Sequence, residues 1–372
     1  MANLTPFSDR HIGPSLIEQS KMLESLNLKS LDDLIYETIP DDIRQKGPLD
    51  LPEALSETEV LKKAKLFASQ NKTFRSYIGM GYYNTNLPSV IQRCILENPS
   101  WYTAYTPYQP EISQGRLEAL INFQTMVQDL TGMEIANASL LDEGTAISEA
   151  VNMAHQITRK KKNKVFVVGP VFSQSLAVLD TRCEPVGIEV ERGNQLPENL
   201  DDYFAVVVQY PNGLGEVNKV EEVLETTQKN SVLSIVSADL MSLCLMKSPG
   251  EMGADIVVGS SQRFGVPVGF GGPHAAYLAT LDKHKRLIPG RIVGASKDSK
   301  GKAAYRLALQ TREQHIRREK ATSNICTAQV LLAVIAGMYG VYHGPDGLKS
   351  IAQDIFEKTS RLAQSLSQLG YE

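Results

Sequence analysis

Four short apolar runs alternate with helical segments in the middle of the chain. The runs cover residues 164–169, 205–211, 232–239 and 253–260, and each is continuously apolar rather than alternating between apolar and polar positions. Strands buried on both faces have this pattern, and the helices between them supply the crossovers of a parallel sheet. The pattern therefore predicts an α/β protein with a mostly parallel sheet.

The first 60 residues follow a different pattern, in which short helices are joined by proline-rich connections. A helix is expected to begin at Pro14 or Ser15, and Ser30 can cap a second helix that ends at Pro40. We expect residues 1–60 to form a helical N-terminal arm on the surface of a larger body.

The rest of the chain is expected to form a large domain and an incomplete small one. Residues 61–330 hold the predicted sheet and a helix over 117–130, whose apolar residues recur at three- and four-residue steps. Residues 331–372 are predicted to form linking helices and the start of a small domain. The last helix ends near Gly370, where a strand would normally begin, so we expect this domain to be truncated.

Composition and charge exclude several classes of protein. The 372 residues are 42% hydrophobic and 22% charged, and the net charge of −4 argues against nucleic acid as the main partner. No apolar run approaches the roughly 18 residues of a membrane span, and the first residues lack the apolar core of a secretory leader. The four cysteines have no C-x-x-C spacing and the six histidines no ligand spacing, so we expect no metal site and a cytoplasmic protein with reduced thiols.

One candidate for chemistry is the loop that leads into a helix at 142–154. Its residues Glu143, Gly144 and Thr145 stand where the unpaired N–H groups and dipole of a helix start attract phosphate. Simple capping of the helix by Asp142 or Thr145 is the alternative, and the two acidic side chains discourage an anion.

Two further candidates follow buried strands. Asp239 stands at the carboxyl end of the run 232–239, where a carboxylate can pair with a protonated pyridine nitrogen or cap the next turn. Gln262 follows the run 253–260 and precedes a glycine-rich loop. A pyridoxal enzyme keeps its Schiff-base lysine at this place, but a glutamine amide cannot form an imine.

The order of these three features is that of the fold-type I pyridoxal-phosphate enzymes, and longer motifs make the resemblance specific. The segments AYTPYQPEISQG, NFQTMVQDLTGMEIANASLLDEGTA, GADIVVGSSQRFGVPVGFGGPHAAYLA and REQHIRREKATSNICTAQ resemble the P-protein of the glycine cleavage system. RHIGPS near the start resembles the long single-chain versions, in which two similar halves follow one another. The similarity covers essentially the whole chain.

The resemblance implies a glycine decarboxylase that binds glycine as an aldimine of pyridoxal phosphate and releases CO2. The aminomethyl group then passes to the lipoyl group of a carrier, the H-protein. In this family the Schiff-base lysine lies in the carboxyl-terminal half or in a separate subunit. Gln262 identifies this chain as the degenerate amino-terminal half, which pairs with that partner as a dimer, holds no covalent cofactor and is inactive alone. Four positions are then relics of a cofactor site: Glu143, Gly144, Thr145 and Asp239.

This half is expected to complete the partner's active site. KATSNICT resembles the loop that contacts phosphate across the dimer in related transferases, and its hydroxyl and amide donors suit an anion. The residues expected to make these contacts are Thr322, Ser323 and Asn324. Arg317, Arg318 and Lys320 would add positive potential. Capping of a helix over 325–340 by Ser323 or Asn324 is the alternative.

A second contribution is expected from aromatic segments, whose tyrosines combine a hydroxyl with a flat packing surface. The residues expected at the substrate mouth are Tyr77, Tyr82, Tyr105, Tyr108 and Gln109. Interface packing explains them nearly as well.

Two competing interpretations remain open. The chain can be a stand-alone pyridoxal enzyme that uses another lysine, such as Lys247 or Lys320, although neither follows a buried strand at the usual place. It can also be a non-catalytic scaffold that docks a partner chain or the lipoyl carrier.

Overall fold

The computed structural model describes residues 13–102, 106–217, 219–310, 314–321 and 329–371. The chain consists of two compact units, of which the first ends at Arg75 and the second begins at Ser76. The division at residues 60 and 330 stays a prediction about domains. No helix in the described part of the chain is both long and apolar enough to span a bilayer.

Within residues 13–75, the first unit contains three helices: α1 (Leu16–Ser25), α2 (Leu31–Thr38) and α3 (Glu57–Gln70). Each is capped by a serine, whose hydroxyl accepts a hydrogen bond from the third helical N–H while an acidic side chain at that position reaches back to the serine backbone. The caps are Ser15, Ser30 and Ser56. The two helices predicted near the start are therefore confirmed, with Ser15 rather than Pro14 as the cap.

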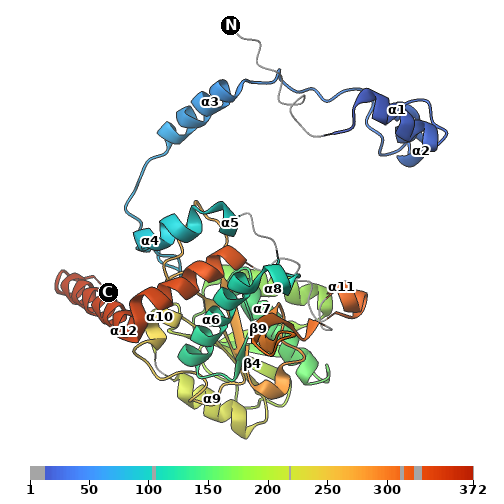
Figure 1. Ribbon diagram of the computed structural model, residues 1–372. Coiled ribbons are helices and arrows are strands. Elements are labelled where there is room, and N and C mark those ends of the chain that lie inside the picture. Colours follow the sequence, from blue (N-terminus) through green and yellow to red (C-terminus); the bar gives the residue numbers. More distant parts are fainter. Residues whose placement is uncertain (1–12, 103–105, 218, 311–313, 322–328, 372) are drawn as a thin grey trace. The chain divides into compact units, whose positions relative to one another are not determined.

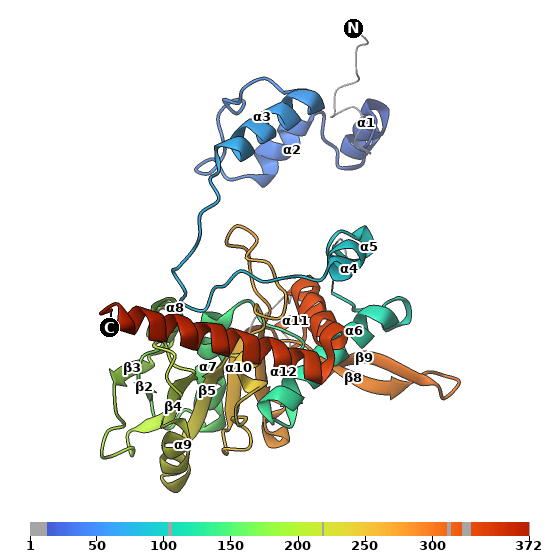
Figure 2. The same ribbon diagram turned by 90° about the vertical axis from the view of Figure 1, so that its left-hand side faces the viewer.

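The second unit is built on a seven-stranded sheet with the order β1-β7-β6-β5-β4-β2-β3 (Figure 2). The strand pairs β3–β2, β2–β4, β4–β5 and β5–β6 are parallel, whereas β7 runs antiparallel to both β6 and β1. The strands are β1 (Ile135–Ala136), β2 (Lys164–Val168), β3 (Glu189–Gly193), β4 (Tyr203–Tyr210), β5 (Leu233–Ala238), β6 (Ile256–Ser260) and β7 (Ala276–Thr280). The four predicted apolar runs form β2, β4, β5 and β6, so the predicted α/β class with a mostly parallel sheet is confirmed.

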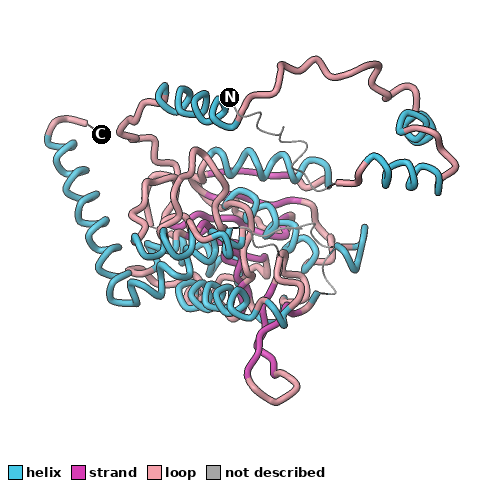
Figure 3. The backbone as a smooth tube through the Cα atoms, turned by 45° about the horizontal axis from the view of Figure 1, so that its top comes forward, coloured by secondary structure: helices cyan, strands magenta, loops and turns pink. Residues whose placement is uncertain are grey.

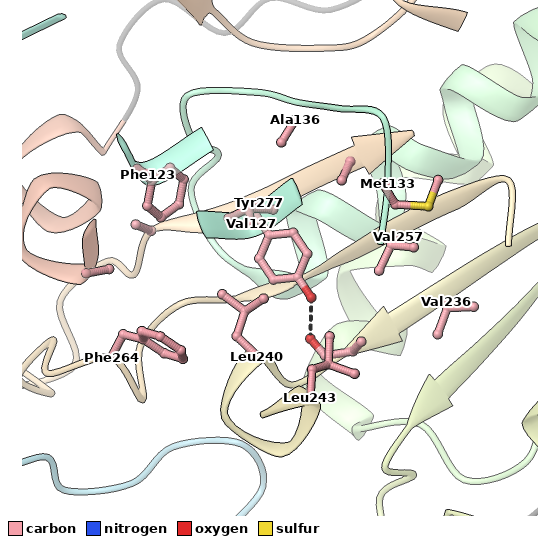
Figure 4. Packing of buried hydrophobic residues seen from close by; sticks show 14 of the residues in the cluster. Phe123, Val127, Met133, Ala136, Val236, Leu240, Leu243, Val257, Phe264 and Tyr277 are labelled. Carbon is pink, nitrogen blue, oxygen red and sulfur yellow. Dashed lines mark hydrogen bonds between the residues drawn. The ribbon is translucent and has the colours of Figure 1, made fainter. Parts of the chain in front are cut away.

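Helices cover both faces of this sheet (Figure 1). The helices of this unit are α4 (Ser89–Ile91), α5 (Pro99–Tyr102), α6 (Gln114–Thr131), α7 (Glu143–Ile157), α8 (Ser173–Cys183), α9 (Val220–Lys229), α10 (Leu240–Leu243), α11 (Gln314–Arg317) and α12 (Val330–Gln368). One core cluster joins the sheet to α6, α9, α10 and α12, and a second joins it to α7 and α8. Phe123 and Tyr277 are fully buried in the first cluster, where the Tyr277 hydroxyl donates a 2.6 Å hydrogen bond to the Ala238 carbonyl (Figure 4).

Helix α12 bends at Gly344, whose φ of 63° and ψ of 178° are not helical, directly before Pro345. The bend separates the two helices expected around 325–340 and 348–366, and each part is helical on its own side of it. Proline within a helix removes one backbone hydrogen bond and clashes with the preceding turn, which explains the position of the bend.

A two-stranded hairpin, β8 (Ile292–Lys297) and β9 (Ala303–Ala308), projects from the second unit (Figure 3). Two glutamines of α6 fasten it at its base. Gln114 exchanges hydrogen bonds of 2.8 and 2.9 Å with the backbone of Tyr305, and Gln124 exchanges bonds of 2.8 and 3.1 Å with that of Val293. A buried amide side chain can thus replace a missing strand neighbour.

Candidate functional site

The three predicted cofactor positions lie along one edge of the sheet. β5 ends directly before Asp239, and β6 ends two residues before Gln262. These strands are parallel neighbours, so their carboxyl ends meet at the same edge. A bridge between Leu140 and Ala276 brings the start of α7 to this edge as well. The order of features in the sequence therefore corresponds to a common location, which we call the relic site: Glu143, Asp239 and Gln262.

The start of α7 is capped from within the chain. The Asp142 carboxylate accepts a 2.8 Å hydrogen bond from the backbone N–H of Thr145, which is the capping alternative considered above. Gly144 allows α7 to approach α8, because a Cβ added to it would lie 3.1 Å from Cβ of Val178. The structure therefore gives Asp142, Gly144 and Thr145 roles in forming and packing this helix.

Glu143 carries an unusual carboxyl group. Its Oε1 is buried and has no hydrogen-bond partner in the described part of the chain. The pKa of Glu143 is raised to about 7, chiefly by burial and in smaller part by the negative charges of Asp239 and Asp142, while the nearby Ser237 hydroxyl opposes the shift without forming a hydrogen bond of normal geometry. The carboxyl is therefore held half-protonated near neutral pH, at the place where a cofactor phosphate would need hydrogen-bond donors.

Asp239 is already paired. Its Oδ2 forms an ion pair with the Arg263 guanidinium, and its Oδ1 accepts a 3.1 Å hydrogen bond from the backbone of Met241. Both partners of the ion pair are about three-quarters buried, with side chains 23% and 25% exposed. The carboxylate that would face a pyridine nitrogen is thus neutralised by a guanidinium of the same chain.

Gln262 is fully buried and acts as a donor to two backbone carbonyls. Its Nε2 donates hydrogen bonds of 2.7 Å to the Tyr83 carbonyl and 2.9 Å to the Val266 carbonyl. Its Oε1 has no hydrogen-bond partner among the described residues. The side chain at the predicted lysine position therefore connects two segments of backbone.

Two tyrosines lie against the relic site. The Arg263 guanidinium lies 5.2 Å from the ring centre of Tyr83, within the range of a cation–π interaction. The Tyr82 ring lies 4.9 Å from that of His274, whose imidazole is buried. Burial lowers the pKa of His274, so the ring is held neutral. Tyr82 is thus brought next to the relic site, and its place at the substrate mouth stays a prediction.

The other predicted mouth residues are not all brought to this place. Tyr77 is 83% exposed, and Gln109 is exposed before a short 3-10 turn. Tyr108 instead contacts Arg291, both through its hydroxyl and across its ring. Tyr105 lies outside the described residues.

The predicted phosphate contacts Thr322, Ser323 and Asn324 also lie outside the described residues, as does the side chain of Lys320. Arg317 and Arg318 are exposed at the end of α11. These assignments stay predictions.

The alternative Schiff-base residue Lys247 is half-exposed and bonds to Glu221 of α9 at 2.5 Å. That bond raises the pKa of Lys247, which keeps the amine protonated and unreactive. The stand-alone enzyme interpretation therefore gains no support from this lysine.

Sequence reasoning missed the residues that occupy the relic site. Arg263 follows Gln262 directly, and the only signal available was a cation next to the predicted lysine position. Tyr83 was not singled out, and Gln174, which donates a 2.7 Å hydrogen bond to the Met80 carbonyl, carries no motif at all.

The chain is similar to known proteins along nearly its whole length. A family model described as glycine cleavage system P-protein matches residues 9–372. Proteins named glycine dehydrogenase (decarboxylating) are 58% identical in Nostoc sp. over 370 residues and in Nitrobacter hamburgensis over 373 residues, in each case 99% of this chain. The chain spans only 38% and 39% of the length of these relatives.

Solved structures agree with this match. A crystal structure of glycine decarboxylase (P-protein) of the glycine cleavage system, in inhibitor-bound form, has a TM-score of 0.82 and 39% identity, covering 91% of this chain and 78% of that one. Sphingosine-1-phosphate lyase of Burkholderia pseudomallei has a TM-score of 0.57 at 12% identity, covering 86% of this chain and 76% of that one. The second likeness shows the fold alone, and it agrees with the fold-type I class expected from the sequence.

Proposed function

The chain belongs to the glycine cleavage system P-protein family, and from this premise we propose that it is the half of a glycine decarboxylase that does not carry pyridoxal phosphate. In the whole protein, glycine is decarboxylated and its aminomethyl group passes to the lipoyl group of the H-protein. This half pairs with the remaining part of the protein, or with a partner subunit, in the cytoplasm and completes the active site there.

The observation that carries this proposal is Gln262. A covalent cofactor requires a free amine at this position, whereas the amide is fully buried and donates to two backbone carbonyls. An amide nitrogen is not nucleophilic enough to capture an aldehyde, and these two contacts leave it no freedom to move towards one.

The surroundings also do not fit the cofactor. A pyridoxal ring would need the Asp239 carboxylate, but Arg263 already occupies it. A phosphate would lie near Glu143, whose buried carboxyl offers negative charge above a pH of about 7 and few donors below it. No catalytic step is therefore assigned to a cofactor bound in this half.

The contribution to the partner half is expected from residues near the relic site and from the 322–324 loop. Tyr82 lies at this edge next to His274, and Tyr77 is fully accessible to a second chain. Thr322, Ser323 and Asn324 are proposed to bind the cofactor phosphate in the partner half through their hydroxyl and amide donors. Tyr105, Tyr108 and Gln109 remain proposed as further residues of the substrate mouth.

The first experiment tests the absence of a cofactor. The purified chain is mixed with pyridoxal phosphate, reduced with borohydride and digested for mass spectrometry. We expect no imine absorbance and no lysine carrying a pyridoxyl group in excess of a denatured control. Stoichiometric labelling of one lysine in the folded chain would overturn the proposal.

The second experiment tests the pairing. The chain is titrated with the separately produced remainder of the protein, and glycine-dependent exchange of CO2 is measured. Activity that appears only in the mixture supports an enzyme half. Binding without activity would instead support the alternative of a docking scaffold, and exchange by the isolated chain would support a stand-alone enzyme.

A further inference from the structure

Residues 79–85, here called the covering segment, are joined to the relic site and to the loop after β6 by the side chain of Gln262. One N–H of its amide bonds the Tyr83 carbonyl at 2.7 Å and the other bonds the Val266 carbonyl at 2.9 Å. The Thr85 hydroxyl donates to the same Val266 carbonyl at 3.0 Å. The covering segment and the loop after β6 are therefore joined through one buried side chain.

The beginning of the covering segment is fixed independently. Gln174 of α8 donates a 2.7 Å hydrogen bond to the Met80 carbonyl. At Gly81, φ is 85°, and an added Cβ would lie 2.9 Å from the ring of Phe172. Only glycine adopts this conformation and allows so close an approach without strain.

Two side chains of the covering segment contact residues around the relic site. The Tyr83 ring lies under Arg263, which in turn holds Asp239, and the Tyr82 ring contacts His274. Part of each tyrosine stays accessible, with 44% of Tyr82 and 42% of Tyr83 exposed. The segment thus contacts the relic site through the Tyr83 carbonyl, and part of Tyr82 and of Tyr83 stays accessible to a second chain.

We propose that Gln262 is a positioning residue. One N–H of its amide holds the covering segment through the Tyr83 carbonyl and the other holds the loop after β6 through the Val266 carbonyl, so that residues of the chain itself fill the relic site. The segment then presents Tyr82 and Tyr83 in a defined geometry to the active site of the partner half. This last step rests on the proposed function, whereas the fixing of the segment does not.

The first test uses the isolated chain and two variants. Gln262→Glu keeps the shape of the side chain but replaces both donors by an acceptor, and Gln262→Met removes all polar atoms at similar size. Chymotrypsin cleavage after Tyr82 and Tyr83 is followed by mass spectrometry. We expect both variants to be cleaved there about tenfold faster than the unchanged chain, because they lose the bond to the Tyr83 carbonyl and the bond to the Val266 carbonyl, which Thr85 also contacts.

Gln114→Glu is the matched control. Gln114 makes the same kind of paired contact with a backbone, that of Tyr305, but on the hairpin β8–β9. Its variant should leave cleavage in the covering segment unchanged. Unchanged cleavage in both Gln262 variants would overturn the proposal, and so would equal acceleration by Gln114→Glu, which would indicate general loosening.

The second test uses the whole protein carrying Gln262→Met. We expect the KM for glycine or the kcat of CO2 exchange to change at least about fivefold, while the amount of bound pyridoxal phosphate and the assembly of the two halves stay the same. Unchanged kinetics despite faster cleavage of the segment would overturn the positioning role. If the unchanged whole protein were inactive, the proposed function would fail, and the cleavage result would still stand by itself.

Discussion

Replacing Glu143 by glutamine should change how the stability of the chain depends on pH. The pKa of Glu143 is raised from an ordinary value of 4.5 to about 7, chiefly because burial disfavours the charged carboxylate. The folded chain therefore binds this proton more tightly than the unfolded chain does. The free energy of unfolding must then decrease as the pH rises from about 4.5 to about 7, and this loss should end above the folded pKa.

The size of the effect follows from the shift. One pKa unit corresponds to about 1.4 kcal/mol, so the carboxyl should destabilise the folded chain at pH 8 by about 3 kcal/mol relative to pH 4. Glutamine has the same shape and no titration. The stability advantage of Glu143→Gln should therefore grow by about this amount between these two pH values.

Urea unfolding of both chains at a series of pH values and constant ionic strength measures this difference. The contributions of other buried groups to the pH dependence are the same in both chains and cancel in the difference. His274, whose pKa is lowered by burial, for example makes both chains lose stability as the pH falls. The exposed Glu198 provides a control, since Glu198→Gln should give a curve parallel to that of the unchanged chain. Parallel curves for Glu143→Gln as well, or a difference that shrinks with rising pH, would refute the reasoning.

Three further substitutions test other parts of the structure. Phe123→Ala removes a fully buried ring from the core between α6 and α12 and should lower the free energy of unfolding by about 3–5 kcal/mol in urea titrations. Asp239→Asn removes a negative charge that raises the pKa of Glu143, so in urea unfolding the fall in stability should end at a lower pH and be smaller. Gln262→Lys supplies the missing amine, yet we expect no borohydride-stable adduct with pyridoxal phosphate at that position, since Arg263 still holds Asp239; a stoichiometric adduct would contradict this.

The strands and helices could be predicted from the sequence because the patterns that indicate them are local. A strand buried on both faces is mostly apolar, and the run that became β4 is so at all positions but Gln209, while that of β5 contains two small serines. Capping serines indicated the starts of α1 and α2, because the hydroxyl and an acidic residue three positions later satisfy free N–H groups within one turn. The reversed direction of β7 was not accessible, since a continuous apolar run carries no information about direction.

The interactions within the relic site were harder to predict from the sequence, because they join residues that are far apart along the chain. The sequence placed Asp239 and Gln262 at strand ends, and the structure brings both to the same edge of the sheet. The ion pair of Asp239 joins residues 24 positions apart, and the bond from Gln262 to Tyr83 spans 179 positions. Neither pairing has a local pattern, because an arginine after a strand and a tyrosine in a glycine-rich segment are common on any surface. The sequence could show that an amine was missing, but not what had replaced it.

Gln262, the ion pair between Asp239 and Arg263, and Glu143 each oppose a different contact of a cofactor, so none of them substitutes for another. Gln262 removes the covalent bond, the ion pair with Arg263 removes the free carboxylate that a pyridine nitrogen needs, and Glu143 replaces donors for a phosphate by a buried acid. A lysine restored at 262 would capture an aldehyde only as well as an isolated amine does, since ring and phosphate would still find no partner. The proposed loss of cofactor binding in this half therefore rests on the whole edge of the sheet, and Gln262 owes its importance at least as much to the carbonyls it holds as to the imine it cannot form.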